Sequence, residues 1–319
     1  MSVAVAHANI ALIKYWGKAD RALNLPAVPS LSLTLAGLRT RTEARLITGA
    51  EDAVTLDGRP AGGRPRARVI AMLDQLRARA GATSRLAITS HNEFPTAAGL
   101  ASSASGFAAL ALAASHALGL ELTRQQLSAL ARQASASAAR SVFGGWAELL
   151  TGCEHASPIA PPEHLDVRML VAVTRRGEKA IGSTEAMLHT AETSPYYDAW
   201  VSSAGALFTR GKSALLARDL PELGRAMEHS TLAMHASMLA ADPGVLYFAP
   251  ESLAVMHAVR ELRGRGFSTF FTLDAGPHVK VLCPSVEAPA VAKELRALPA
   301  VLELLEAAPG PAAELLEAP

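Results

Sequence analysis

Residues 95–105 read PTAAGLASSAS, a run of small and polar side chains that precedes a long alanine-rich segment. The chain before it, Leu86–Ser90, is predicted to be a strand, and Ser102–Leu118, which contains no proline, is predicted to be a helix ended by Gly119. Backbone N–H groups at such a helix start form an anion site, because the positive end of the helix dipole lies there. The loop has neither the Gly-Lys-Ser/Thr of a Walker A motif nor the spacing G-x-G-x-x-G. On its own it fits phosphate binding and an ordinary capped helix equally well.

The rest of the N-terminal half mixes strands and helices. Apolar runs and period-two alternation predict strands, and a Thr before a helical pattern predicts an N-cap. The expected elements are strands over Ala8–Tyr15, Leu31–Leu35, Thr40–Ile47 and Ala53–Leu56, a turn at Asp57-Gly58, helices over Arg66–Ala80 and Arg124–Ser135 with Thr123 as the N-cap of the second, and a bend at Gly144-Gly145. A proline-rich link, Pro158–Pro162, precedes Met169–Thr174, which is taken as the last strand of this half.

The C-terminal half is predicted to be mainly helical. The expected elements are helices over Ser183–Leu188, Tyr197–Ala217, Leu220–Met238 and Leu253–Arg263, and a strand pair, Thr269–Leu273 and Val279–Leu282, joined by Asp274–His278. The pattern predicts an α+β protein with domains at residues 1–175 and 176–304. The last residues, 305–319, are low in complexity and are expected to be an appendage without chemistry.

Composition excludes several classes of protein. The 319 residues are 50% hydrophobic, which is enough for a large core. Lys and Arg number 30 against 29 Asp and Glu, which argues against a nucleic-acid binder, and the arginines between residues 59 and 79 lack interleaved aromatics. Cys153 and Cys283 have no metal-ligand or disulfide-framework spacing. Without a signal peptide or a membrane-length apolar run, the sequence predicts a soluble, cytoplasmic protein.

Four separated segments resemble one family. They are ANIALIKYWGK (residues 8–18), NEFPTAAGLASS (92–103), ASAARS (136–141) followed by Gly144-Gly145, and TLDAGP (272–277). Together they resemble mevalonate diphosphate decarboxylases, which belong to the superfamily of galactokinase, homoserine kinase, mevalonate kinase and phosphomevalonate kinase. The resemblance implies an N-terminal domain like ribosomal protein S5 domain 2, a ferredoxin-like C-terminal domain, and an active site in the cleft between them.

The resemblance also implies an activity. The family converts mevalonate 5-diphosphate and ATP to isopentenyl diphosphate, CO₂, ADP and phosphate in the mevalonate pathway of isoprenoid biosynthesis, after phosphorylating the 3-hydroxyl group. ATP is then a co-substrate, Mg²⁺ accompanies it, and a homodimer is expected.

Two residues are expected to be catalytic. Asp274 follows an apolar strand in a tight turn, where its carboxylate can accept or orient the proton of the 3-hydroxyl, or stabilise positive charge at the tertiary carbon. The alternative is an Asp that caps the turn. Arg140 follows small residues, and its guanidinium matches the substrate carboxylate in shape and charge. The alternative for Arg140 is a salt bridge.

The remaining site residues follow from the resemblance. Substrate binding is expected from Tyr15, Trp16, Gly17, Lys18, Arg68, Ser137, Ala138, Ala139, Arg140, Ser141, Ser183 and Thr184. ATP binding is expected from Gly99, Leu100, Ala101, Ser102, Ser103 and Ser105, with Ser102 also near Mg²⁺. Trp16 has a packing role as its alternative, and Ser183 and Thr184 have helix N-capping as theirs.

One departure from the family pattern concerns the substrate. The family has an Asn-Ser-Ser run where this chain has Pro26-Ala27-Val28-Pro29-Ser30, so Val28 and Pro29 replace two polar residues. The alternatives are a decarboxylase for mevalonate 5-phosphate and a 3-kinase that does not decarboxylate. A non-catalytic sensor of phosphorylated metabolites is a further alternative, but it would be expected to lose Asp274 or the loop serines.

Overall fold

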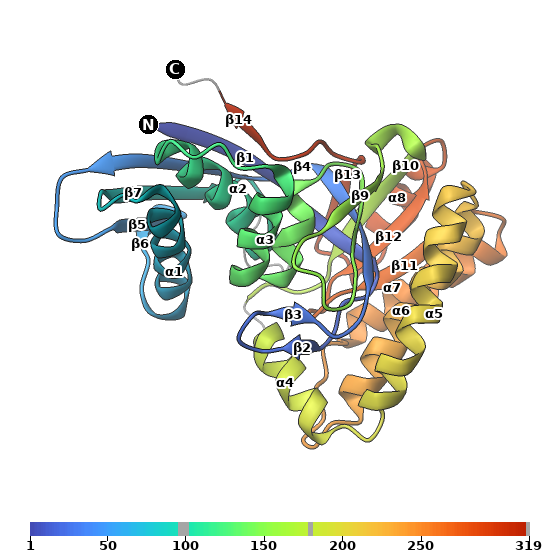
Figure 1. Ribbon diagram of the computed structural model, residues 1–319. Helices are drawn as coiled ribbons and strands as arrows, with labels where there is room; N and C mark the ends of the chain where they lie inside the picture. The colour runs from blue at the N-terminus through green and yellow to red at the C-terminus, as the bar shows by residue number, and fades with distance from the viewer. Residues whose placement is uncertain (95–101, 178–180, 317–319) are drawn as a thin grey trace.

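The computed structural model describes residues 1–94, 102–177 and 181–316, which form two sheets with helices packed on them (Figure 1). The first part of the chain forms β1 (Ser2–Ile13), β2 (Lys18–Asp20), β3 (Leu25–Pro26), β4 (Ser30–Ile47), β5 (Ala53–Leu56), β6 (Arg59–Pro60), α1 (Gly63–Ala80), β7 (Arg85–Asn92), α2 (Ser102–Ala117), α3 (Arg124–Ala134), a 3₁₀ helix (Ala136–Val142), β8 (Trp146–Leu149) and β9 (Ser157–Ala160). The second part forms a 3₁₀ helix (Pro162–His164), β10 (Val167–Val173), α4 (Ser183–Thr193), α5 (Tyr197–Leu216), α6 (Leu220–Leu239), α7 (Pro250–Gly264), β11 (Phe270–Leu273), β12 (Val279–Pro284), α8 (Ala288–Arg296), β13 (Glu303–Ala307) and β14 (Glu314–Leu316). The α+β class is therefore confirmed.

The first sheet has the order β14-β1-β4-β7-β5-β6, with β8 and β9 continuing from β4. Helices α1, α2 and α3 cover one face and share a core with it. The alanines of α2 bring that helix close to the sheet, and Thr123 caps α3 in a capping box with Gln126, as predicted. The two strands predicted at 31–35 and 40–47 are one strand, β4, because β1 pairs along nearly its whole length.

The second sheet is antiparallel with the order β11-β12-β10-β13. The chain runs strand, helices, strand, strand, helix, strand, which is the ferredoxin-like arrangement expected. Side chains of β10 alternate between two cores: Leu170 packs with α7 and α8, whereas Met169 packs with β1, β4 and α6. Residues 169–174 were expected to end the N-terminal half, but the strand formed there, β10, pairs with β12 and β13 of the second sheet. The change of sheet falls between residues 160 and 167.

The proline-rich link and the C-terminal residues are built into the sheets, contrary to expectation. Strand β9 (Ser157–Ala160), which overlaps Pro158–Pro162, pairs with β8, and β13 completes the second sheet. The chain then returns to the first sheet, where the Gly310 amide donates to the Thr34 carbonyl and β14 pairs with β1. A Cβ at Gly144 would lie 2.5 Å from the Ala312 nitrogen, so glycine there allows the returning chain to pass. The described part of the predicted tail is therefore structural.

Helix α8 had not been anticipated at all, although its Pro near the start and its buried Val291 and Leu295 give it an apolar face. No helix within residues 1–94, 102–177 and 181–316 is long and apolar enough to cross a membrane.

Candidate active site

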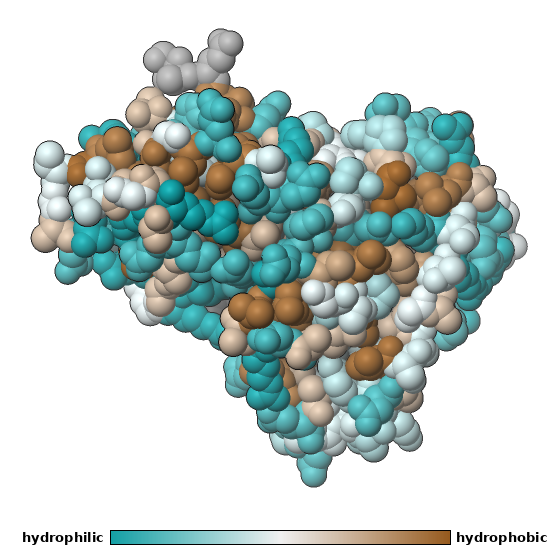
Figure 2. All heavy atoms as spheres, viewed as in Figure 1, coloured by the Kyte–Doolittle hydropathy of each residue, from teal (hydrophilic) through white to brown (hydrophobic). Residues whose placement is uncertain are grey.

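A cleft of about 1710 Å³ lies where the two halves of the chain meet. Its walls come from the end of β1 and the β2–β3 hairpin, the starts of α1, α2 and α4, the 3₁₀ helix after α3, and the turn after β11. In Figure 2 the outline is indented between the surface over α1 and the surface over α4, two elements that line the cleft from opposite sides.

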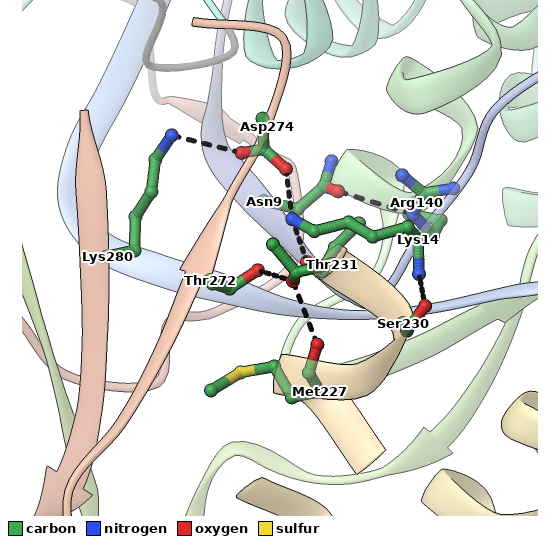
Figure 3. Close-up of polar contacts among 10 residues, drawn as sticks. Asn9, Lys14, Arg140, Met227, Ser230, Thr231, Thr272, Asp274 and Lys280 are labelled. Carbon is green, nitrogen blue, oxygen red and sulfur yellow. Dashed lines mark hydrogen bonds and ion pairs between the residues drawn. The ribbon is translucent and has the colours of Figure 1, made fainter. Parts of the chain in front are cut away.

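Asp274 lies in this cleft between two buried lysines (Figure 3). Its Oδ1 is 2.5 Å from Lys14 Nζ and its Oδ2 is 3.3 Å from Lys280 Nζ. Both lysine side chains are 1% exposed, whereas Asp274 is 26% exposed and faces the cleft. Burial would raise the pKa of the Asp274 carboxyl, but the two ammonium groups outweigh it and hold that pKa well below its usual value. Burial lowers the pKa of Lys14 to about 8, with Asp274 opposing the shift.

Helix α6 fixes the positions of both Lys14 and Asp274. The Ser230 hydroxyl accepts a hydrogen bond from the Lys14 backbone N–H at 2.9 Å. One residue further along α6, the Thr231 hydroxyl lies 2.9 Å from that of Thr272, two residues before Asp274 (Figure 3). Lys14 Nζ also donates to the Ala11 carbonyl at 2.8 Å. The Lys14–Asp274 pair therefore rests on buried hydrogen bonds from three different elements, which limits its movement.

Arg140 is held in a buried network beside this pair. Its Nη1 donates to the Ser30 hydroxyl at 2.7 Å, and its Nε donates to Asn9 Oδ1 at 3.3 Å. The Asn9 amide donates in turn to the Ser141 hydroxyl at 2.8 Å and to the Ser137 carbonyl at 3.0 Å. Burial lowers the pKa of Arg140 to about 10, so the guanidinium remains charged at neutral pH.

No carboxylate of the described residues forms an ion pair with Arg140. The salt bridge that was its alternative role is therefore not formed there. A buried, unpaired guanidinium that lines a cleft favours binding of an anion, because leaving it uncompensated is costly.

Cations gather at another part of the cleft. Lys18 and Arg68 both line it, and neither has an acidic partner among residues 1–94, 102–177 and 181–316. Arg68 is oriented by the Ala134 carbonyl, which accepts from its Nε at 2.9 Å, and by the Phe107 ring, 4.5 Å from its guanidinium carbon. The buried Tyr15 hydroxyl has no hydrogen-bond partner among the described residues. These groups provide several donors for a phosphorylated ligand.

The loop expected to bind phosphate lies only partly within the described residues. Ser102 and Ser103 line the cleft at the start of α2, as predicted. Ser105 does not: its hydroxyl is buried and lies 2.6 Å from that of Thr40, so its predicted contact with phosphate is replaced by a bond that fixes α2 to β4. Gly99, Leu100 and Ala101 lie outside the described residues.

Four other residues predicted to bind substrate do not line the cleft but lie in the structure that surrounds it. Ala138 and Ala139 are buried in the core under α2, and Ser141 is used by Asn9, so none of the three lines the cleft. Gly17 does not line it either; its φ is +107°, and a Cβ there would clash with the Tyr197 hydroxyl.

Trp16 and Val28 belong to one apolar cluster. Trp16 borders the cleft, but its side chain is 1% exposed and packs in this cluster, which fits the alternative packing role. Val28 packs in the same cluster and, like Pro29, does not line the cleft. The departure from the family run is therefore mostly a packing change, and Ser30 of that run still holds Arg140.

Ser183 and Thr184 line the cleft at the start of α4. The N-cap of α4 is Gly182, so the predicted capping role of Ser183 and Thr184 is not observed. Thr174 and His278 also line the cleft, and the His278 Nδ1 accepts a hydrogen bond from the Thr174 backbone N–H at 3.1 Å.

Sequence reasoning missed Lys14, Lys280 and Asn9. Asn9 and Lys280 lie within the buried strands β1 and β12, and Lys14 directly follows β1. A lysine is almost never buried without a partner. The signal in the sequence was a lysine in each of two predicted buried apolar segments. Each buried lysine requires an acidic partner, and in the structure Asp274 is the partner of both.

Substitution of Lys14 tests the electrostatics of this trio. In Lys14→Met, Asp274 keeps only Lys280 as a cation, so its pKa rises and the acidic limb of the kcat–pH profile moves to higher pH. The basic limb, which we expect near pH 8 from the Lys14 ammonium, should disappear. We expect kcat at pH 7 to fall roughly 10- to 100-fold.

Lys14→Arg is the matched control, because it keeps the positive charge. Its acidic limb should stay in place while its basic limb moves up. Profiles of Lys14→Met with both limbs unchanged would show that Lys14 does not set the charge of Asp274.

Comparison with protein families gives two matches that together span most of the chain. Residues 6–160 match a diphosphomevalonate decarboxylase-like N-terminal domain, and residues 169–307 match a mevalonate 5-diphosphate decarboxylase C-terminal domain. The chain is similar to a diphosphomevalonate decarboxylase of Aspergillus fumigatus, 34% identical over 92% of this chain and 79% of the relative. It is also similar to a phosphomevalonate decarboxylase of Haloferax volcanii, 31% identical over 88% of this chain and 87% of the relative.

Solved structures agree with these matches. Mevalonate diphosphate decarboxylase from Staphylococcus aureus superposes with a TM-score of 0.94 at 36% identity, over 99% of this chain and 98% of that one. A complex of a protein abbreviated MDDEF with MVAPP, AMPPCP and magnesium superposes with a TM-score of 0.92 at 39% identity, over 99% of each chain.

Proposed function

The chain belongs to the mevalonate diphosphate decarboxylase family, and we propose that its cleft converts mevalonate 5-diphosphate and ATP to isopentenyl diphosphate, CO₂, ADP and phosphate. The observation that carries this proposal is that a carboxylate and a guanidinium both line one cleft. An ionised carboxylate, Asp274, is fixed between two lysines, and a buried guanidinium, Arg140, has no acidic partner in the described chain. A tertiary alcohol and a carboxylate of the same substrate match these two groups.

In the first step, the 3-hydroxyl oxygen forms a bond to the γ-phosphorus of ATP and the bond to ADP breaks. Late in this transfer the hydroxyl proton passes by way of Asp274 to water in the cleft. Asp274 accepts the hydrogen bond of that hydroxyl and orients its oxygen. Because the pKa of Asp274 is held low, it is a weak base, and orientation is the larger part of its role. A loose phosphoryl-transfer transition state needs little activation of the nucleophile.

In the second step, the C3–O bond to the new phosphate breaks and positive charge develops at the tertiary carbon. The bond between C2 and the carboxylate carbon then breaks, its electron pair forms the double bond, and CO₂ leaves. The Asp274 carboxylate stabilises the positive charge. Arg140 orients the departing carboxylate. Because its guanidinium also donates hydrogen bonds to Asn9 and Ser30, it stabilises the substrate carboxylate less strongly before the reaction.

ATP is the co-substrate and Mg²⁺ accompanies it, as in the MDDEF complex with AMPPCP and magnesium. No group of three or more His, Cys, Asp or Glu side chains in the described ranges is arranged to hold a metal ion. This fits Mg²⁺, which keeps water and phosphate oxygens as most of its ligands. The Ser102 and Ser103 hydroxyls at the start of α2 would hold the ion and the phosphates, and Mg²⁺ would neutralise charge on the phosphate oxygens.

The phosphates of the substrate are assigned to the cationic part of the cleft, with Tyr15, Lys18 and Arg68 as ligands. Ser183 and Thr184, from the second half of the chain, complete the binding site. Several unpaired cations fit a diphosphate better than a monophosphate. The similarity to a phosphomevalonate decarboxylase keeps mevalonate 5-phosphate as the second candidate substrate.

Removal of the Lys18 charge tests this assignment. Lys18→Ala should raise KM for mevalonate 5-diphosphate about tenfold, because a charge-assisted hydrogen bond to phosphate is lost. The effect on mevalonate 5-phosphate should be smaller. Lys293→Ala, an exposed lysine of α8 that does not line the cleft, serves as the control. Equal losses for both substrates would move Lys18 away from the terminal phosphate.

Comparison of three substrates distinguishes the two candidate substrates from each other and an enzyme from a sensor. Mevalonate, its 5-phosphate and its 5-diphosphate are each supplied with Mg-ATP, and ADP is measured for each. The proposal predicts the highest kcat/KM for the diphosphate. A higher value for the monophosphate would make the second candidate correct, and no turnover of any of the three would favour the sensor.

The family resemblance also supports a homodimer and a cytoplasmic location. Both are part of the proposal.

A further inference from the structure

Helix α1 carries one more cation at the phosphate end of the cleft. Arg64 and Arg68 are four residues apart on α1, so they lie on the same face of the helix, and both line the cleft together with Lys18. Positive charge on Arg64 lowers the pKa of both Lys18 and Arg68, after burial, so the three groups are close enough to repel one another. Sequence analysis placed Arg64 only in a local basic cluster.

Two nearby arginines, Arg66 and Arg21, have acidic partners, but Arg64 has none in the described chain. Arg66 Nη2 lies 3.1 Å from Glu51 Oε2, and Arg21 Nη2 lies 2.6 Å from Glu192 Oε1. Arg64 forms no ion pair and no hydrogen bond with any residue in 1–94, 102–177 and 181–316. Arg64 and Arg66 are two residues apart on α1. Glu51 neutralises Arg66, whereas Arg64 lines the cleft without an acidic partner in the described chain.

The position of Arg64 is unfavourable in the protein alone. It lies in the first turn of α1, where the positive end of the helix dipole disfavours a cation, and no acidic residue occupies that turn. Repulsion from Lys18 and Arg68 adds to this cost. An anionic ligand with more than one charge relieves all of these repulsions at once.

We propose that Arg64 binds the terminal phosphate of mevalonate 5-diphosphate and that it is a specificity-determining residue against the monophosphate; this assignment rests on the proposed function. The three cations differ in exposure and in the contacts that hold their side chains, which divides their tasks. Arg68 is oriented by Ala134 and Phe107, and Lys18 is half-buried. Arg64 is exposed and has no hydrogen-bond partner among the described residues, so it is the cation placed to bind the outer phosphate, which the monophosphate lacks.

Binding measured by calorimetry without ATP tests the proposal separately from turnover. The dissociation constants of mevalonate 5-diphosphate and 5-phosphate are compared for the wild type, Arg64→Gln and Arg66→Gln. Arg64→Gln should weaken binding of the diphosphate about tenfold and of the monophosphate less than about twofold, since one charge-assisted hydrogen bond is lost. Arg66→Gln should leave both unchanged, because Arg66 faces Glu51 and does not line the cleft.

Three results would overturn the proposal: equal weakening of both ligands in Arg64→Gln, no weakening of either, or a rise in KM for ATP with unchanged diphosphate binding. The last result would place Arg64 on the nucleotide. Failure of the proposed function has a different signature. A wild type that binds the diphosphate in an Arg64-dependent manner but releases no CO₂ would support the inference about Arg64 and contradict the decarboxylase.

Discussion

Asp274→Asn is expected to reduce kcat roughly a thousandfold while the Kd for Mg-ATP stays within about twofold of the wild type. The amide has nearly the same shape as the carboxylate, so the substrate still fits. It carries no negative charge, so it cannot stabilise the positive charge that develops at the tertiary carbon. Single-turnover measurement of CO₂ and ADP, with nucleotide binding measured in parallel, separates the loss of chemistry from a loss of binding.

Glu251→Gln is the matched control for this variant. Glu251 is an exposed carboxylate that lines the same cleft, at the start of α7. Neutralising Glu251 should leave kcat within about twofold of the wild type. Glu251 is exposed, so water and salt screen its charge from the reacting carbon. Asp274→Asn leaves Lys14 and Lys280 without their acid, so its thermal stability is measured as well. A folded Asp274→Asn protein that turns over at the wild-type rate would remove Asp274 from the chemistry.

Arg140→Lys is expected to lower kcat/KM about a hundredfold, although the charge is kept. The guanidinium makes separate hydrogen bonds to Asn9 and Ser30 and still presents donors to the cleft. A lysine ammonium cannot hold both partners and the substrate carboxylate in one plane. We expect most of the loss in kcat, because the role assigned to Arg140 is orientation of the carboxylate for departure.

Lys212→Arg is the control for Arg140→Lys, because it exchanges lysine and arginine at a position outside the cleft. Lys212 is bonded to Glu148 at 2.7 Å and does not line the cleft. Its replacement should leave kcat/KM within about twofold, since exposed or half-buried ion pairs contribute little. Wild-type kcat and KM in Arg140→Lys would place Arg140 outside the site.

Local patterns predicted most helices and the cleft residues that lie in recognisable motifs. Helix α2 and the cap at Thr123 depend on propensity and on hydrogen bonds within a few residues, which a sequence displays directly. Asp274 and Arg140 stand in short motifs, and both line the cleft.

Except for helix α8, whose signal was local, the main errors come from pairing between residues distant in the chain. Strand β10 could not be assigned to its sheet, because its partners β12 and β13 come more than a hundred residues later. The tail has a low-complexity composition, yet its backbone is ordered by hydrogen bonds to β1 and β4, which the composition does not reveal. Lys14 and Asp274 are 260 residues apart, and only the fold brings them together.

Release of CO₂ from carboxyl-labelled mevalonate 5-diphosphate, with and without Mg-ATP, tests the central claim most directly. The account predicts labelled CO₂ only when Mg-ATP is present, with one ADP formed for each CO₂. ADP formation without labelled CO₂ would contradict the claim, because it would show a kinase that stops at the 3-phosphate.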